Sequence, residues 1–585
     1  MLPTRLQYFL TTPVDKPRDR RLLIWFGLSI AVALIHTYLG LREAFSSPYV
    51  IHDDVRSHVF WMRRFLDPGL FPNDLIADYF QSVAPTGYTA LYRSMAALGI
   101  DPVTFNKFLP LPLVLITTVY CFWISMQIFP VPAAGFIATL LLNQTTWNTH
   151  DIPSGTPRAF IYPLFLAFLY YLLRRSLLPC LVTIVLQGLF YPQTVFLSCG
   201  VLVLRLVRFE RGRLRWSGDR ADYVFCGAGL AVGVGMLLPY ALKISEYEPV
   251  LTVAEARVLP TLEGDGRKNF FFDDLFKFWF CGERSGMLPY NWCKYERPPQ
   301  LWASLLLPLL LWRPKRFPRL ASLTPQAAVL PQILLASLGM FFLAHALLFR
   351  LHLPSRYTKH SIRMLVALAA GIALVVLLDA ALRWAAARSA KSFGGRTLPT
   401  LGAVGLLGVY IFGYPLLMDR YPNPDYVRAE APPMYEFFAQ QPPDILIASL
   451  SEQANNIPSL ARRSVLTSSE IANPYHMGYY RQIQARTYDL MQAQYSLDLA
   501  EVQRFIRQYG VDFWLVDSVA FEPDYIERNS WLRQIEPHAS VAQQHLMAGE
   551  EPALAQLMRS CRAFRTGGRI VLDAACILSA KAPLD

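Results

Sequence analysis

Charged side chains are scarce in this sequence. Only 17% of its 585 residues are Asp, Glu, Lys or Arg, whereas 53% are hydrophobic. A water-soluble globular chain usually carries about 25% charged residues. The shortage excludes an ordinary soluble protein, and repeated apolar runs of about 20 residues predict a polytopic membrane protein.

Nucleotide-binding signatures are also missing. The sequence has neither a G-x-G-x-x-G fingerprint nor a phosphate-binding G-K-[ST] loop, so nothing indicates a nucleotide cofactor. The formal net charge is +12, but the basic residues lie in short gaps between apolar runs and form no stripe on a soluble face. We therefore expect no nucleic acid among the partners.

The apolar runs predict a mainly α-helical membrane part over residues 1–417, with about eleven spanning helices. Several runs are short for a bilayer of about 30 Å, and the prolines between some of them mark kinks or turns. The expected spans are 22–41, 108–129, 131–147, 159–173, 177–190, 193–207, 223–243, 300–312, 326–348, 361–382 and 398–417.

The positions of arginine and lysine predict the orientation of these helices. Arg18, Arg20 and Arg21 precede the first run, and positive charge beside a first span favours a cytoplasmic N-terminus. That run is as long as a full span and no A-x-A-like site follows it, so we expect an anchor that is not cleaved. Further basic clusters then lie in cytoplasmic gaps at 174–176, 208–222, 313–325 and 383–397.

Three larger segments fall on the outer side: a first loop at 42–107, a second loop at 244–299 and a C-terminal segment at 418–585. Apolar residues at helical spacing predict an amphipathic helix over 55–66, lying on the membrane surface. The C-terminal segment is predicted to be an extracytoplasmic α/β domain. Its expected strands are 444–450, 511–516, 569–573 and 575–578, and its expected helices are 476–494 and 498–509.

The eight cysteines divide by location. Four lie in apolar runs, where a thiol is an ordinary buried group. The other four lie on the predicted outer side, where an oxidising compartment favours disulfides. Four cysteines allow three pairings, and we expect the two local ones, Cys281–Cys293 and Cys561–Cys576.

An acidic pair, Asp53 and Asp54, follows the first span and is flanked by His52 and His58. Carboxylates at that depth are costly without a partner or a function. One interpretation is a helix N-cap, because Asp before a helix accepts backbone N–H bonds. The other is an active site, with the pair as general base or with Asp54 and Asp151 holding a divalent metal such as Mg²⁺ or Mn²⁺. Both interpretations stay open at this point.

Two further turns on the outer side carry candidate residues. His150, Asp151 and Arg158 lie between the third and fourth spans, in either an ordinary Pro/Gly turn or part of the same site. Arg356 and Lys359 lie in a later turn. They either anchor a helix end at the membrane interface or bind a lipid-linked phosphate, for which Arg offers a planar fork and Lys a point charge.

These features together resemble the GT-C superfamily of polytopic membrane glycosyltransferases, in an uncharacterised bacterial branch. The resemblance rests on a large first loop that opens with Asp53-Asp54, an amphipathic helix in that loop, a second acidic turn at His150-Asp151, and an outer soluble domain after the last span. The W-W-D-Y-G signature of oligosaccharyltransferase members is absent, so asparagine is not the expected acceptor.

The resemblance implies a transferase of the bacterial cytoplasmic membrane. It would move a sugar from a polyprenyl-phosphate carrier to an acceptor, which the sequence does not identify, at the outer face of the membrane. The implied site residues are Asp53, Asp54 and Asp151 for catalysis, Arg158, Arg356 and Lys359 for the donor phosphate, and His52, His58 and His150 in support.

Two other classes of function fit part of the pattern. Intramembrane charge also marks the path of a transporter or flippase, although the sequence lacks the two related halves typical of transporters. A non-catalytic factor in envelope assembly is the third possibility. Release of polyprenyl phosphate from a labelled carrier is the reaction that separates the three.

Overall fold

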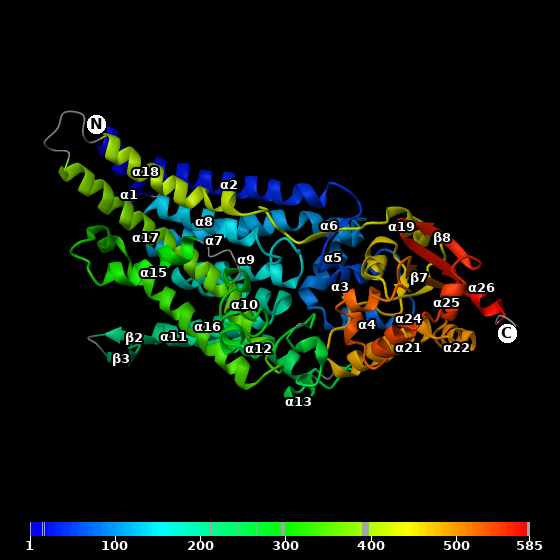
Figure 1. Ribbon diagram of the computed structural model, residues 1–585. Coiled ribbons are helices and arrows are strands. Elements are labelled where there is room, and N and C mark those ends of the chain that lie inside the picture. Colours follow the sequence, from blue (N-terminus) through cyan, green and yellow to red (C-terminus); the bar gives the residue numbers. More distant parts are fainter. Residues whose placement is uncertain are drawn as a thin grey trace.

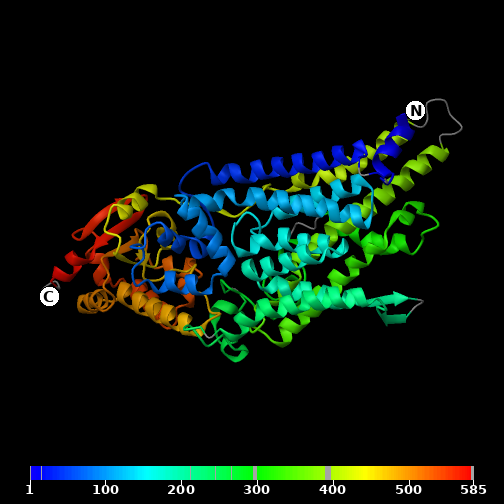
Figure 2. The ribbon, with the colours of Figure 1, turned by 180° about the vertical axis from the view of Figure 1, so that it is seen from behind.

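The computed structural model describes residues 2–14, 16, 18–210, 213–243, 245–264, 266–293, 299–388 and 397–581. Long helices lie side by side through one part of the molecule, and shorter helices and strands form the end that contains the C-terminus (Figures 1 and 2). Residues 211–212 and 389–396, in two of the predicted cytoplasmic gaps, lie outside the described part of the chain.

Each of the predicted apolar runs forms a helix. The helices are α2 (Arg20–Ala44), α7 (Pro110–Ile128), α8 (Pro132–Thr146), α9 (Ile161–Leu173), α10 (Leu177–Phe190), α11 (Gln193–Arg205), α12 (Arg220–Leu242), α15 (Pro299–Leu311), α16 (Val329–Ala346), α17 (Lys359–Arg388) and α18 (Thr397–Phe412). Among the described residues, five helices are long and apolar enough to cross a membrane, namely those that contain α2, α7, α12, α16 and α17. A multi-pass, mainly helical protein is therefore confirmed, whereas the count of eleven spans stays a prediction.

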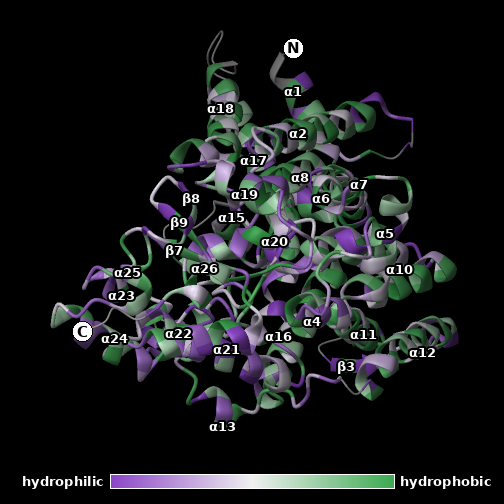
Figure 3. Cartoon of the chain, turned by 90° about the vertical axis from the view of Figure 1, so that its right-hand side faces the viewer, coloured by the Kyte–Doolittle hydropathy of each residue, from purple (hydrophilic) through white to green (hydrophobic). Residues whose placement is uncertain are grey.

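Helix α17 is the centre of the helical part. It packs against α8, α15, α16 and α18, and 78% of its most apolar window is buried, against 28% for α2 and 17% for α12. Hydrophobic residues predominate on α2 and α12, whereas α21 (Met477–Tyr495), a helix of the C-terminal segment, carries more hydrophilic ones (Figure 3). The two outlying helices α2 and α12 thus expose apolar surface suited to lipid.

The first loop folds differently from the expectation. Residues 55–66 contain a short α3 (Val55–His58) and a 3₁₀ helix η1 (Phe60–Phe65), and most of their apolar side chains are fully buried. Arg63, on the supposed polar face, is also buried and binds Asp101 (Nε–Oδ1, 2.7 Å). The predicted amphipathic surface helix is wrong, because protein encloses this segment on both faces.

A five-stranded sheet of order β6-β5-β7-β9-β8 organises the C-terminal segment. Its β6-β5-β7 half is parallel and its β7-β9-β8 half antiparallel. The strands are β5 (Leu446–Ser449), β6 (Ser464–Val465), β7 (Phe513–Asp517), β8 (Arg562–Thr566) and β9 (Arg569–Asp573), and α22 (Leu499–Tyr509) follows α21. Asp498 caps α22 by accepting the N–H of Ala500 at 2.8 Å. That the segment is a separate domain stays a prediction.

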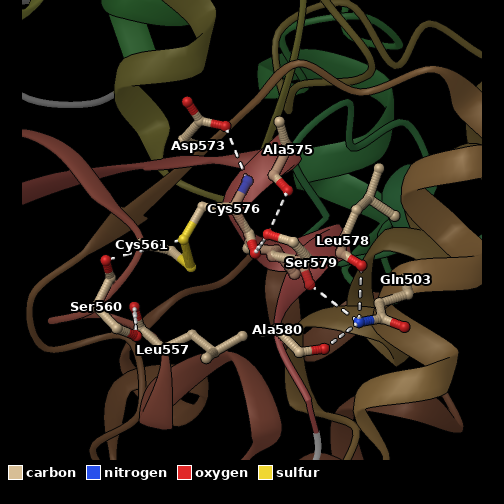
Figure 4. The surroundings of a disulfide bond; sticks show 11 residues. Gln503, Leu557, Ser560, Cys561, Asp573, Ala575, Cys576, Leu578, Ser579 and Ala580 are labelled. Atoms are coloured by element: carbon tan, nitrogen blue, oxygen red, sulfur yellow. Dashed lines mark hydrogen bonds between the residues drawn. A yellow bond between two sulfur atoms is a disulfide. The ribbon is translucent and has the colours of Figure 1, made fainter.

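Residues 575–578 are helical rather than extended. They belong to α26 (Ala574–Ser579), because the Asp573 carboxylate accepts the N–H of Cys576 at 3.1 Å and starts a helix there. A disulfide between Cys561 and Cys576 joins the start of β8 to this helix (Figure 4). A second disulfide joins Cys281 and Cys293 in the second loop.

A short ladder ties the first loop to the C-terminal segment. Strand β1 (Val50–His52) pairs antiparallel with β4 (Tyr426–Arg428). The backbone N–H of Asp53 extends the ladder by donating to the carbonyl of Asp425 at 3.2 Å. The acidic pair therefore emerges from a point that two distant parts of the chain hold together.

Candidate active site

A cavity of about 450 Å³ lies directly after β1. Its wall combines the first loop, the turn after α8, the second loop, the turn before α17 and the C-terminal segment. The predicted residues that line it are Asp53, Asp54, His58, His150, Arg158 and Arg356. Residues from turns far apart in sequence thus meet at one cavity.

The environment of Asp54 decides between the two interpretations of the acidic pair. Asp54 occupies the N-cap position of α3, but its side chain accepts no capping hydrogen bond. Its Oδ2 contacts the guanidinium of Arg158 instead, and both residues line the cavity. The carboxylate is therefore directed to a cation of the cavity wall and not to the helix backbone.

Asp53 belongs to a second group of charges. Arg56 binds both Asp53 and Glu470, the latter at 3.1 Å between Nη2 and Oε2. Burial raises the pKa of the Asp53 carboxyl, and the negative charge of Glu470 raises it further, while Arg56 opposes both effects. A raised pKa brings a carboxyl closer to the range in which it can exchange protons at neutral pH.

The two histidines beside the acidic pair have different positions. His52 is buried, and its Nδ1 accepts the backbone N–H of Asp54 at 3.1 Å. His58 lines the cavity, and burial lowers its pKa to about 4, so it is uncharged at neutral pH. His52 can thus position Asp54, whereas His58 can contact a bound molecule.

Asp151 and Lys359 lie behind the cavity wall. The buried Asp151 carboxylate binds Lys359 Nζ at 3.2 Å and Arg363 Nη1 at 2.6 Å. His360 Nδ1 lies 3.4 Å away, and the Tyr162 hydroxyl donates to Oδ2 at 3.0 Å. These groups bind one another, and neither Asp151 nor Lys359 is among the residues that line the cavity. Their roles in catalysis and phosphate binding stay predictions, and the geometry favours a structural role for both.

Asp425 is a cavity residue that the sequence did not indicate. The Nδ1 of His150 contacts its carboxylate, and both side chains line the cavity. Asp425 has a φ of 55°, a left-handed conformation that Asp tolerates better than most residues. No local motif marks it, because it reaches the cavity only through the β1–β4 ladder.

Arg356 is the cation of the cavity wall with the fewest hydrogen bonds and ion pairs to other side chains. Within the described part of the chain, no side chain forms a hydrogen bond or ion pair with its guanidinium. Its 3₁₀ helix η7 (Pro354–Tyr357) is held to the second loop, since Ser355 donates its N–H to the carbonyl of Arg284 (3.2 Å) and its hydroxyl to that of Glu283 (2.9 Å). An uncommitted guanidinium on a fixed turn can bind an anion.

The second loop and the C-terminal segment add further lining charges, which are Arg267, Lys268, Glu283, Arg284 and Glu470. Burial would raise the pKa of Glu283, but Arg284, Lys359 and Arg356 lower it to about 2. Glu283 is therefore ionised at neutral pH. These residues come from turns without any motif, so only the folded chain brings them together.

The predicted metal ligands do not fit a shared cation site. Asp151 binds Lys359 and Arg363 behind the wall, and Asp54 contacts Arg158 in the cavity. Among the residues the structure describes, no group of three or more His, Cys, Asp or Glu side chains is arranged to hold an ion. A hard divalent cation needs several oxygen ligands, so we assign no step to a metal.

No family model and no curated protein matches the sequence, but solved structures match the fold. The Archaeoglobus fulgidus oligosaccharyltransferase in its apo form has a TM-score of 0.50 at 10% identity, covering 89% of this chain and 72% of that one. The oligosaccharyltransferase AglB from the same archaeon, in complex with an inhibitory peptide and a dolichol-phosphate, has a TM-score of 0.52 at 10% identity, covering 88% of this chain and 72% of that one.

ArnT from Cupriavidus metallidurans in its apo state has a TM-score of 0.46 at 12% identity, covering 95% of this chain and 99% of that one. At 10% identity, the likeness to the oligosaccharyltransferase concerns the fold alone. At that level this chain has the fold of the Archaeoglobus fulgidus oligosaccharyltransferase, as the predicted resemblance expects.

Proposed function

We propose that the protein is a glycosyltransferase that moves a sugar from a polyprenyl-phosphate carrier to an acceptor hydroxyl at the outer face of the membrane. One observation carries the proposal: the uncommitted guanidinium of Arg356 lines the same cavity as the carboxylate of Asp54. Such a cavity offers both a proton acceptor and a group that stabilises a leaving phosphate. The dolichol-phosphate bound by AglB is a carrier of this kind.

The proposed reaction is a displacement at the anomeric carbon. Asp54 takes the proton of the acceptor hydroxyl, the oxygen bonds to the anomeric carbon, and the bond from that carbon to the phosphate oxygen breaks. The departing polyprenyl phosphate gains negative charge, which Arg356 and Arg158 stabilise. Asp151, Lys359 and Arg363 brace the start of α17 beneath this site and touch no substrate.

The orientation follows from the same proposal. The N-terminus is cytoplasmic, and the two loops, both disulfides and the C-terminal segment from residue 418 face an oxidising outer compartment. A reporter fused after residue 420 is expected to be active only outside the cytoplasm. Activity inside would place the cavity on the wrong side for a carrier presented at the outer face.

Release of polyprenyl phosphate from a labelled sugar carrier tests the function. Purified protein with a membrane extract as acceptor source should release it, and Arg356→Gln should not. The matched control is Arg350→Gln, since Arg350 is exposed on the same turn and is not among the lining residues. Movement of an intact carrier across liposomes without release would favour a flippase instead.

A further inference from the structure

We propose that the cavity contains a second anion-binding subsite, formed by Lys268 and Arg284 beside Arg356. It takes a second anionic group, which is either the second phosphate of a diphosphate-linked carrier or an anionic group on the acceptor. The inference rests on the proposed function for the identity of the first anion only.

The positive charge of Lys268 is only weakly balanced by neighbouring negative charge. Its Nζ lies 3.7 Å from Oε1 of Glu470, beyond hydrogen-bond reach. Arg56 and Arg267 already bind the other oxygen of that carboxylate. The Lys268 side chain is only 18% exposed, so water offers its ammonium group few hydrogen bonds in place of a protein partner.

The positive charge of Arg284 is also only weakly balanced. Its Nη1 makes two long contacts, 3.4 Å to Oδ1 of Asn269 and 3.5 Å to Oε2 of Glu283. Both exceed the usual distance for a charge-assisted hydrogen bond. Its side chain is 12% exposed. A guanidinium with five donors is therefore held loosely at the wall of the cavity.

The charges of the wall do not balance at this point. Asp53 and Asp54 are bound by Arg56 and Arg158, and Asp425 contacts His150. Burial lowers the pKa of His150 to about 4, so it is uncharged and leaves the Asp425 charge in place. Arg267 binds Glu470. The remaining lining charges are three cations, Lys268, Arg284 and Arg356, against two carboxylates, Glu283 and Asp425, which leaves one positive charge in excess. Buried charge of one sign is costly unless an opposite charge joins it, so the cavity suits an added anionic group.

Hydrogen bonds also join the three short segments that carry these cations, one between side chains and one between backbone groups. Asn269, next to Lys268, accepts from Arg284, and the carbonyl of Arg284 accepts the N–H of Ser355, next to Arg356. Burial lowers the pKa of Lys268, and the nearby charge of Arg284 lowers it further against the opposing effect of Glu470. This repulsion is what a bound anion relieves.

Binding of two soluble probes to the purified protein tests the subsite. Farnesyl diphosphate is expected to bind about tenfold more tightly than farnesyl phosphate, because it adds charge-assisted hydrogen bonds. Lys268→Gln and Arg284→Gln should each abolish this difference while changing farnesyl phosphate binding less than about threefold. Arg356→Gln should weaken both probes, and Arg350→Gln neither. Retention of binding in Lys268→Arg excludes misfolding as the cause.

A second arm identifies the source of the anion. If both probes bind equally, inorganic phosphate is added to protein saturated with farnesyl phosphate. Additional phosphate binding that Lys268→Gln abolishes supports the subsite and assigns it to the acceptor. If neither a diphosphate preference nor this second binding occurs, the subsite is refuted, while farnesyl phosphate binding that depends on Arg356 leaves the proposed function standing. Failure of farnesyl phosphate to bind at all counts against the proposed function, and binding of inorganic diphosphate that requires Lys268 then supports the subsite by itself.

Discussion

The carboxylate of Asp54 contacts the guanidinium of Arg158, and this pair joins the first loop to the 3₁₀ helix η2 (Pro157–Phe160) that precedes α9. Both side chains are mostly buried, at 17% and 16% exposure. Removing the negative charge therefore does two things at once. It deletes the proposed base, and it leaves a shielded arginine without its counter-charge.

Asp54→Asn is expected to lower sugar transfer by about 10²–10⁴-fold, the usual effect of losing a general base. It should also lower the unfolding temperature, because Arg158 loses its ion pair. Combining it with Arg158→Gln should recover the unfolding temperature and leave transfer abolished. Thermal unfolding and transfer are measured on the same preparations. Transfer within about threefold of the parent, where a lost base costs at least about 10²-fold, would move the base to Asp53.

Arg356→Lys is expected to fail in transfer although charge is kept, because a lysine cannot reproduce the two parallel donors of a guanidinium. Protein amount in the membrane should stay normal, since Arg356 holds no described partner that the change would strand. The matched control is Arg350→Lys on the same turn. Full transfer by Arg356→Lys would identify Arg356 as an interfacial anchor.

Asp151→Asn is expected to act on stability rather than on chemistry. The change leaves Lys359 and Arg363 buried without their carboxylate, and breaking a buried ion pair typically costs about 3–5 kcal/mol. Adding Lys359→Met should recover part of the unfolding free energy, because one of the stranded charges is then gone. A normally stable Asp151→Asn protein without activity would return Asp151 to the catalytic residues.

Glu470 predicts a pH dependence of stability. Burial would raise the pKa of its carboxyl, but Lys268, Arg267 and Arg56 lower it to about 2, below the ordinary value of about 4.3. A depressed pKa gives stabilisation that is complete above about pH 4.3 and is lost as the pH falls toward 2. The gap in unfolding temperature between the parent and Glu470→Gln should therefore be wide at pH 7 and narrow at pH 3. An equal gap at both values would contradict the ion-pair cluster.

Loss of the Cys561–Cys576 disulfide, which closes a separation of 15 residues, is expected to cost about 3 kcal/mol in the chain-entropy model. The Cys561→Ser/Cys576→Ser protein should unfold at a lower temperature than the parent and give the same transfer rate at low temperature. Peptide mapping without reduction checks the pairing directly. Free thiols at both positions in protein from intact membranes would refute it.

The apolar runs predicted the helices well because burial in lipid or protein demands hydrophobic length, which a sequence displays directly. Strand β9 and helices α21 and α22 were also predicted nearly to the residue, since turns, caps and periodicity are local signals. The fold of residues 55–66 was predicted wrongly, because Arg56 and Arg63 are buried and form ion pairs with distant residues. Asp425, Lys268 and Glu470 carry no local signal, and they join the cavity only through tertiary contacts.

The β1–β4 ladder has a consequence for how this protein is made. One wall of the cavity is synthesised soon after the first helix, whereas its partner strand and residues such as Glu470 are synthesised only after the last helix. Until the ribosome has released that late portion and it has paired with β1, the newly inserted chain has only part of its cavity. A protein shortened after α18 would thus keep most of its helical part and still lack a complete cavity, so the cavity is completed only at the end of the protein's synthesis.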